Sequence, residues 1–178
     1  GRNSYATAVN DVGDVAGWAF VNDSLTHAIR YVGSTLQDLG TLGGNTSYAF
    51  GINHAGVIVG QSNAFSNGPL RPVKWSAGTW SDLGDLGGAT GAALGINNAG
   101  EIVGQSDKSG GLTVTHGFLY KNNVMTDLGT LGGQFSTGFA ISPSSQIVGI
   151  AALSGTGGQH AASWQSGLVT DLGTLGGT

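Results

Sequence analysis

The sequence predicts an all-β protein, a β-propeller built from blades of four antiparallel strands. Two observations predict this fold. A glycine-rich block recurs four times at a nearly constant period, and each period contains short apolar stretches separated by turn residues. A period of about 40 to 45 residues with four strands is typical of a propeller blade.

The recurring block reads Asp-Leu-Gly-x-Leu-Gly-Gly, and its successive copies begin 44, 45 and 44 residues apart. A fixed period of this size indicates one supersecondary unit that is repeated along the chain. We therefore expect a single repeat domain over residues 1–178. Its predicted blades are residues 1–44, 45–88, 89–133 and 134–178.

Each repeat is expected to form four strands, and the second repeat illustrates the assignment. Apolar residues there alternate or run for only a few positions, and β-branched and aromatic types dominate. Gly or Pro interrupts every run before the roughly 10 to 12 residues that a helix needs. The predicted strands of this repeat are residues 48–53, 57–61, 72–76 and 79–83.

Turn residues separate these strands. The first two strands of a repeat are joined by Asn-x-x-Gly, beginning at Asn10, Asn53 and Asn97, whereas the fourth repeat has Ser142-Pro143-Ser144-Ser145. Asn side chains stabilise tight turns and Gly accepts a positive φ. The last two strands are joined by short pairs such as Ala77-Gly78, which favour two-residue hairpins. Each repeat is thus predicted to be an antiparallel meander.

A single sheet of this size carries apolar residues on both faces and must pack against its neighbours. Radial stacking into a propeller does this, and a parallel β-helix is the alternative architecture. Because every predicted blade is contiguous in sequence, no strand exchange would latch a ring. Three arrangements stay open: a closed ring of four blades, a homo-oligomer joined through the end blades, and a longer array.

Composition excludes several classes of partner. The net charge is −4 with only six Lys and Arg, so nothing indicates nucleic-acid binding. No apolar run approaches the roughly 20 residues of a membrane span, so we expect no membrane insertion. The absence of cysteine excludes disulfides and thiolate metal sites. We expect no cofactor and no metal ion.

Three blocks carry a resemblance to a known family. They are Gly-Ile-Asn-x-x-Gly-x-Ile-Val-Gly, His-Ala or His-Gly before an apolar pair that ends in an aromatic, and Asp-Leu-Gly-Thr-Leu-Gly-Gly. Together they resemble the HAF family of bacterial extracellular repeats over the whole chain. Arg71-Pro72-Val73 departs from the pattern in the second copy. The resemblance implies a bacterial protein that is secreted or on the cell surface, often as a longer array, and it implies no established chemistry.

Histidine and aspartate recur eleven residues apart, which suggests either a metal site or catalytic dyad, or a structural hydrogen bond. An active site needs one constellation, whereas a feature of three blades serves the blade. We therefore expect structural pairs that tie the third strand to the fourth. The residues are His27, His116 and His160 with Asp38, Asp127 and Asp171, and in the second copy Arg71 stands before Asp82.

The segments between second and third strands vary most and should share one rim with the Gly-Gly crossovers. Loops mounted on a rigid scaffold are where binding usually resides. Aromatic rings beside amides and carboxylates suit a sugar, whose apolar face stacks on a ring while its hydroxyls form hydrogen bonds. The candidate ligand-binding residues are Trp18, Phe20, Asn22, Asp23, Asn63, Phe65, Asn67, Arg71, Asp107 and Lys108.

Two function classes follow. The first is a non-catalytic extracellular module that binds a glycan or a protein through the variable rim. The second is a structural unit whose blade faces join chains into rings or filaments. No Gly-x-Ser-x-Gly or His-Glu-x-x-His motif is present and no phosphate-binding Lys follows the Gly-Gly blocks, so we do not expect an enzyme.

Overall fold

The computed structural model describes residues 3–109, 114–155 and 158–176, and this part of the chain contains strands and turns without a helix. The strands are β1 (Ser4–Val9), β2 (Val15–Phe20), β3 (Thr26–Val32), β4 (Thr35–Asp38), β5 (Ser47–Ile52), β6 (Ile58–Asn63), β7 (Leu70–Ser76), β8 (Thr79–Asp82), β9 (Gly87–Ile96), β10 (Ile102–Lys108), β11 (Thr115–Lys121), β12 (Val124–Asp127), β13 (Gly132–Ile141), β14 (Ile147–Leu153), β15 (Gln159–Gln165) and β16 (Leu168–Asp171).

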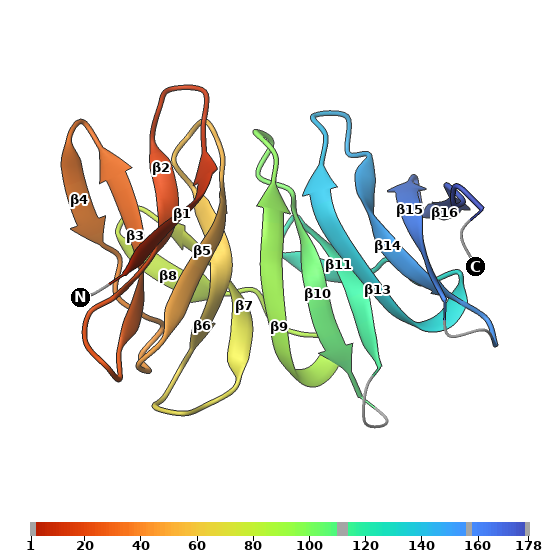
Figure 1. Ribbon diagram of the computed structural model, residues 1–178, viewed down its shortest axis with the longest axis horizontal. Coiled ribbons are helices and arrows are strands. Elements are labelled where there is room, and N and C mark those ends of the chain that lie inside the picture. The colour runs from red at the N-terminus through yellow and green to blue at the C-terminus, as the bar shows by residue number, and fades with distance from the viewer. Residues whose placement is uncertain (1–2, 110–113, 156–157, 177–178) are drawn as a thin grey trace.

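The strands form four antiparallel groups of four, in which neighbours in sequence are neighbours in space (Figure 1). The last two groups are joined into one eight-stranded sheet by a parallel contact between β11 and β13. We call the four groups blades 1 to 4: β1–β4, β5–β8, β9–β12 and β13–β16. Strand content and order agree with the sequence prediction. The alternative of a parallel β-helix is wrong, because the strands within each blade are antiparallel. β9 and β13 begin earlier than expected, since Gly87 and Gly132 already pair with the second strand of their blade.

The predicted hairpins between third and fourth strands are present, and their backbone explains their sequences. Both turn residues have positive φ: 50° and 86° at Ala77-Gly78, 53° and 62° at Asn122-Asn123. This is the requirement of a two-residue type I′ turn, whose twist matches that of the flanking strands. Gly33-Ser34 and Ser166-Gly167 have the same conformation.

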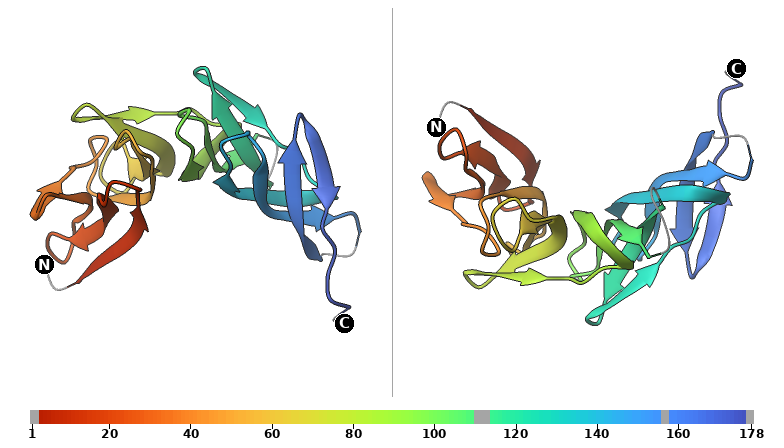
Figure 2. Two further views of the ribbon diagram at one scale, coloured as in Figure 1. Left: turned by 90° about the horizontal axis from the view of Figure 1, so that it is seen from above. Right: turned by 90° about the horizontal axis from the view of Figure 1, so that it is seen from below.

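The four blades stand side by side in an open arc (Figure 2). The first strands β1, β5, β9 and β13 contact one another in succession along its inner side, and the hairpins ending in the fourth strands lie on its outer side. In the described part of the chain no strand of blade 1 pairs with a strand of blade 4. The arrangement therefore differs from a closed ring of four blades.

The hydrophobic core is divided into three clusters, one between each pair of consecutive blades. Between blades 1 and 2, Ala16 and Ala28 pack against Ile58 and Trp75. Ile102 lies in the next cluster and Ile147 in the third, and both are at most 2% exposed. Burial of each such aliphatic side chain contributes about 1.5–3 kcal/mol, so the contacts between blades stabilise the fold.

Backbone pairing between blades is sparse. Thr115 pairs with Phe135 in parallel, and a single parallel bridge joins Thr26 to Thr46. Two further bridges join the crossover residues Leu86 and Leu131 to the blade that follows, at Lys108 and Leu153. The blades are thus joined chiefly by side chains. In the part of the chain that the structure describes, no helix could cross a membrane.

Candidate binding rim

The second strands end and the third strands begin at one rim of the arc, at the bottom of Figure 1. The loops that join these strands in blades 1 and 2 lie there together with the crossovers from one blade to the next. Each glycine-rich crossover packs against the loop of the blade that follows. The Gly44 N–H donates to the carbonyl of Asn63 at 3.0 Å. A Cβ on Gly88 would lie 2.5 Å from the Cβ of Asp107, so only glycine allows this approach. The variable loops and the Gly-Gly segments therefore share a rim, as the sequence predicts.

Five aromatic rings form a continuous cluster that begins at this rim of blade 1 and extends onto β5. Trp18 stacks on Tyr5 with ring centroids 4.1 Å apart, and its edge meets Phe20 at 5.7 Å and Tyr48 at 5.2 Å. Tyr48 in turn stacks on Phe50. Tyr5 is 46% exposed and Phe20 36% exposed. We call these five residues the aromatic cluster.

Two members of the aromatic cluster, Trp18 and Phe20, are candidates from the sequence, and the other three are not. Tyr5 pairs with Trp18 across β1 and β2, so both side chains leave the same face of blade 1. Tyr48 occupies the equivalent position of blade 2. The alternation of side chains along the predicted strands is the signal that could have placed Tyr5 beside Trp18.

The polar candidates beside these rings lie in exposed loops. Asn22 and Asp23 are exposed, and the Asn22 side chain accepts a hydrogen bond from the Ser24 N–H at 2.8 Å. In blade 2, Phe65 is 61% exposed and Asn67 is exposed with a φ of 58°. These four residues are accessible to a ligand at the rim.

Asn63 differs from the expectation, because it is only 3% exposed. Its Oδ1 accepts from the Thr46 N–H at 2.9 Å, and its Nδ2 donates to Asn45 Oδ1 at 2.7 Å. The crossover from blade 1 covers it, so Asn63 fixes the crossover and offers no exposed group to a ligand. Loop composition alone gives no sign of this cover.

Arg71 is held by two carboxylates. Its Nε donates to Asp82 at 2.6 Å and its Nη2 to Asp85 at 2.7 Å. Desolvation lowers the pKa of Arg71, but the hydrogen bonds and charges of Asp82 and Asp85 outweigh it and raise the pKa above its ordinary value. The guanidinium is therefore occupied by its own blade.

The candidates of blade 3 are similarly engaged. Asp107 accepts hydrogen bonds from Thr115, at 2.8 Å, and from Thr90. The Lys108 ammonium lies 2.7 Å from Asp127. Asp107 also lines a hollow of about 310 Å³ between blades 2 and 3, with Gln61 and Gln105. This hollow brings amide and carboxylate groups to the same rim as the aromatic cluster.

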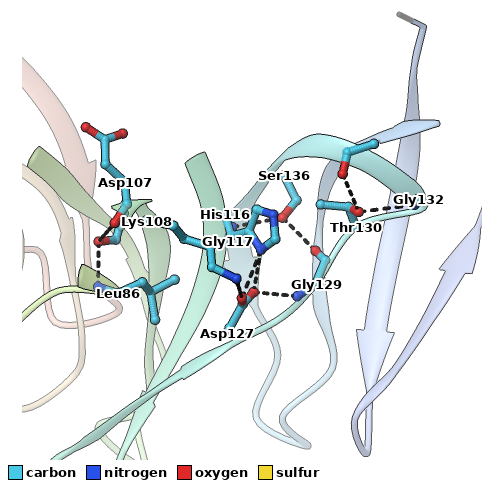
Figure 3. Close-up of polar contacts among 12 residues, drawn as sticks. Leu86, Asp107, Lys108, His116, Gly117, Asp127, Gly129, Thr130, Gly132 and Ser136 are labelled. Atoms are coloured by element: carbon cyan, nitrogen blue, oxygen red, sulfur yellow. Dashed lines mark hydrogen bonds and ion pairs between the residues drawn. The ribbon is translucent and has the colours of Figure 1, made fainter. Parts of the chain in front are cut away.

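The eleven-residue histidine–aspartate spacing produces the expected pairs. Nδ1 of His116 lies 2.8 Å from Asp127 Oδ1, and the same carboxylate accepts the Gly129 N–H and the Lys108 ammonium (Figure 3). His27–Asp38 and His160–Asp171 have the same geometry. Each pair joins the start of the third strand to the end of the fourth. The arrangement orients the backbone beyond Asp127, where the chain leaves the blade.

Two of these carboxylates have displaced pKa values. Desolvation raises the pKa of Asp127, but the Lys108 ammonium, the Gly129 N–H and His116 outweigh it and lower the pKa below its ordinary range. The Gly173 N–H and His160 lower the pKa of Asp171. Both groups are thus held in the charged form.

Three acidic residues outside the repeat pattern, Asp14, Asp85 and Glu101, are in ion pairs. Asp14 pairs with Arg30 at 2.5 Å, and Asp85 pairs with Arg71. Glu101, 5% exposed, lies 2.6 Å from Lys121 and accepts from Ser145 Oγ of blade 4 at 2.6 Å. Among the residues placed in the structure, no three His, Asp or Glu side chains gather into a set that could hold a metal ion.

The opposite rim contains a ladder of asparagines that sequence reasoning missed. Asn53 Oδ1 accepts the Val57 N–H at 3.0 Å, as expected for the turn, while its Nδ2 donates to the Asn97 carbonyl of the next blade at 3.2 Å. Asn10 donates to Asn53 in the same way, and Asn97 to Ser142. One side chain thus closes a turn and joins two blades, and the recurrence of Asn rather than Ser was the available signal.

No family model and no curated protein matches this chain. Among solved structures, TolB from Acinetobacter baumannii is similar to it, with a TM-score of 0.70 and 16% sequence identity. The similarity covers 96% of this chain and 43% of the TolB chain, in the β-propeller region. The chain thus spans less than half the length of TolB. At this identity the likeness concerns the fold alone.

Proposed function

We propose that this chain is a non-catalytic β-propeller module, related to the HAF extracellular repeats, that binds a glycan at the rim through the aromatic cluster. The observation that carries the proposal is the exposure of Tyr5 and Phe20 on either side of Trp18. Exposed rings provide apolar faces on which a sugar ring can stack.

Neighbouring groups supply the polar half of such a site. Asn22 and Asp23 follow Phe20 directly, and Gln61, Gln105 and Asp107 line the hollow farther along the same rim. Amide and carboxylate groups are the hydrogen-bonding partners that sugar hydroxyls need. The secreted or cell-surface location that the HAF resemblance implies is part of this proposal.

The test is a titration of the chain with cellohexaose and chitohexaose, followed by tryptophan fluorescence and calorimetry. Trp75 and Trp164 are at most 6% exposed, and Trp80 packs between blades 1 and 2 with its Nε1 donating to the Leu39 carbonyl at 2.8 Å. Trp18, which lies in the aromatic cluster, should therefore dominate the change in emission. The variant Phe20→Ala should bind threefold to tenfold more weakly, a loss of about 0.5–1.5 kcal/mol.

Phe139→Ala is the matched control, because Phe139 is 48% exposed on blade 4 and lies outside the aromatic cluster. It should bind like the unmodified chain. Lack of any response at millimolar oligosaccharide, or an equal loss in both variants, would contradict glycan binding at the aromatic cluster.

A further inference from the structure

Blades 1 and 4 each have a sheet face that points away from the rest of the arc, which we call the outer face of that blade. The outer face of blade 1 carries apolar residues whose equivalents are buried in the other blades. Tyr31 is 44% exposed, whereas its equivalents Trp75 and Trp164 are 6% and 2% exposed. Val9 is 65% exposed, whereas its equivalent Ile52 is 8% exposed. A hollow of about 220 Å³ on this face is lined by Ser4, Ala6, Val15 and Tyr31, among others. In blades 2 to 4 the preceding blade covers the equivalent residues.

The outer face of blade 4 shows the complementary pattern. Val148 is 42% exposed, whereas Val59 and Val103 at the same position are fully buried. Leu172 is 57% exposed, whereas Leu39 is 7% exposed against blade 2. In blades 1 to 3 the following blade covers these positions. The two ends of the arc therefore expose the two halves of the contact that repeats inside it.

A serine defines the register of that contact. Ser47 Oγ accepts the Ala28 N–H of blade 1 at 2.8 Å and donates to the Gly40 carbonyl at 2.6 Å. Ser136 does the same with Gly117 at 2.9 Å and Gly129 at 2.6 Å, as Figure 3 shows. We call this arrangement the serine bridge.

Both halves of a further serine bridge lie at the ends of the arc. Ser4 has the strand position of Ser47, because each precedes the tyrosine that pairs across to the second strand. Ala161 corresponds to Ala28, and its carbonyl accepts from Leu172 as that of Ala28 accepts from Leu39. Gly173 corresponds to Gly40, since the N–H of each donates to the aspartate two residues earlier.

We propose that the outer face of blade 4 docks onto the outer face of blade 1 of a second copy of this chain, with Ser4 bridging the N–H of Ala161 and the carbonyl of Gly173. The proposal goes beyond glycan binding and does not depend on it. The internal interfaces define the occupant, because a blade face of this kind is covered in this molecule by the opposite face of the same repeat. Such a contact is heterologous, so copies join head to tail.

The curvature of the arc and the asparagine ladder set limits on the contact. Both ends of the arc face its open side, which favours copies that close on one another (Figure 2). Ser142 has no amide to donate to the next blade, so the contact lacks one rung of the ladder. We expect association that is weaker than the internal interfaces and depends on concentration.

The test is light scattering across a dilution series of the chain and two variants. Tyr31→Glu charges the face of blade 1, and Leu172→Glu charges the face of blade 4. Each side chain is exposed, so the folded blade should tolerate the change, which circular dichroism verifies. The unmodified chain should have a mass of two or more copies, and each variant should associate at least about tenfold more weakly.

Mixing the two variants distinguishes a head-to-tail contact from a symmetric one. A mixture keeps one intact face of each kind, so it should form a species of two chains at concentrations where each variant alone is a monomer. Phe65→Glu, on the rim, is the control and should associate like the unmodified chain. A monomeric unmodified chain, or either variant alone associating as strongly as the unmodified chain, would overturn the proposal.

The register is tested by cross-linking, since the chain has no cysteine of its own. Chains with Ser4→Cys and chains with Ala161→Cys should form a disulfide when mixed under mild oxidation, because the serine bridge places the two positions within reach of one. Either variant alone should form none. Failure of the mixture to cross-link would overturn the register.

Discussion

Pro72 and Gly91 meet across the interface between blades 2 and 3, where a Cβ on Gly91 would lie 2.9 Å from Pro72 Cγ. At this position the other two interfaces have the serine bridge. Proline has no N–H to donate and glycine has no hydroxyl to accept it. The N–H donor and the hydroxyl that accepts from it are thus replaced together.

The variant Gly91→Ser should therefore destabilise the chain, because the new side chain meets Pro72 and the Gln105 carbonyl. We expect a loss of about 1–3 kcal/mol in the free energy of unfolding, measured in urea. The double variant Pro72→Ala with Gly91→Ser restores the donor and the hydroxyl, and it should be more stable than the sum of the single variants predicts. Strict additivity would contradict the account.

The asparagine ladder predicts that substitutions of Asn53 reduce the free energy of unfolding by an amount that grows with the number of hydrogen bonds removed. Asn53→Asp keeps the acceptor for the Val57 N–H but loses the donor to Asn97, and we expect a cost of about 1 kcal/mol. Asn53→Ala loses both bonds in a buried site and should cost about 2–3 kcal/mol. Ser142→Ala, where the side chain closes its turn without a rung to a further blade, is the comparison in thermal unfolding. A smaller loss in Asn53→Ala than in Ser142→Ala would argue against the ladder.

The lowered pKa of Glu101 predicts that part of the folding stability is lost in acid. The Lys121 ammonium and the Ser145 hydroxyl, with a further bond from Asn97, outweigh desolvation and lower the pKa of Glu101 below 4.5. A carboxylate with a lowered folded-state pKa stabilises the fold above its unfolded-state pKa, and this stabilisation is lost as the pH falls through the folded value. Stability should therefore decline as the pH drops below about 4.5.

The variant Glu101→Gln cannot be protonated at this position, so it should lack the part of the acid-induced loss of stability that Glu101 causes. At pH 7 it should lose about 1.5–3 kcal/mol, since hydrogen bonds to the buried charge are weakened. The free energy of unfolding, measured in urea at a series of pH values, should converge with that of the unmodified chain in acid. Parallel curves at all pH values would show that Glu101 contributes no proton-linked stability.

Asp127 and Asp171 make a matched pair for the histidine–aspartate contact. Asp127 binds both His116 and Lys108, whereas Leu153 stands at the position of Lys108 in blade 4. Asp127→Asn should cost about 0.5–1.5 kcal/mol at neutral pH. Asp171→Asn should cost less. Equal midpoints of urea unfolding for the two variants would contradict the contribution of Lys108.

The strands and turns of each blade are predictable from the sequence, because the turn residues specify the local backbone conformation. Ala77-Gly78 and the Asn-x-x-Gly turns specify φ values that only a few residue types adopt, so they locate the strand ends without tertiary information. The serine bridge and the asparagine ladder are contacts between repeats, for which a single repeat gives no register. Curvature of the arc depends on these contacts, and the sequence leaves it open.

The candidate site was predicted less completely, for a related reason. Trp18 and Phe20 lie in a segment that breaks the repeat, and they belong to the exposed aromatic cluster. Asn63 and Arg71 lie in a similar segment of blade 2. The preceding crossover covers Asn63, and two carboxylates hold Arg71. Whether a loop residue faces solvent depends on the neighbouring blade, which composition does not describe.

Because each blade is one contiguous stretch joined to its neighbours chiefly by side chains, the chain should respond to mechanical force in steps. Pulling on the two termini would load the three blade interfaces in series, so that they separate one after another. Each step would release the 44 or 45 residues of one repeat, about 150 Å of extended chain. A force trace would then show evenly spaced events, and the weakest blade interface would set the first of them.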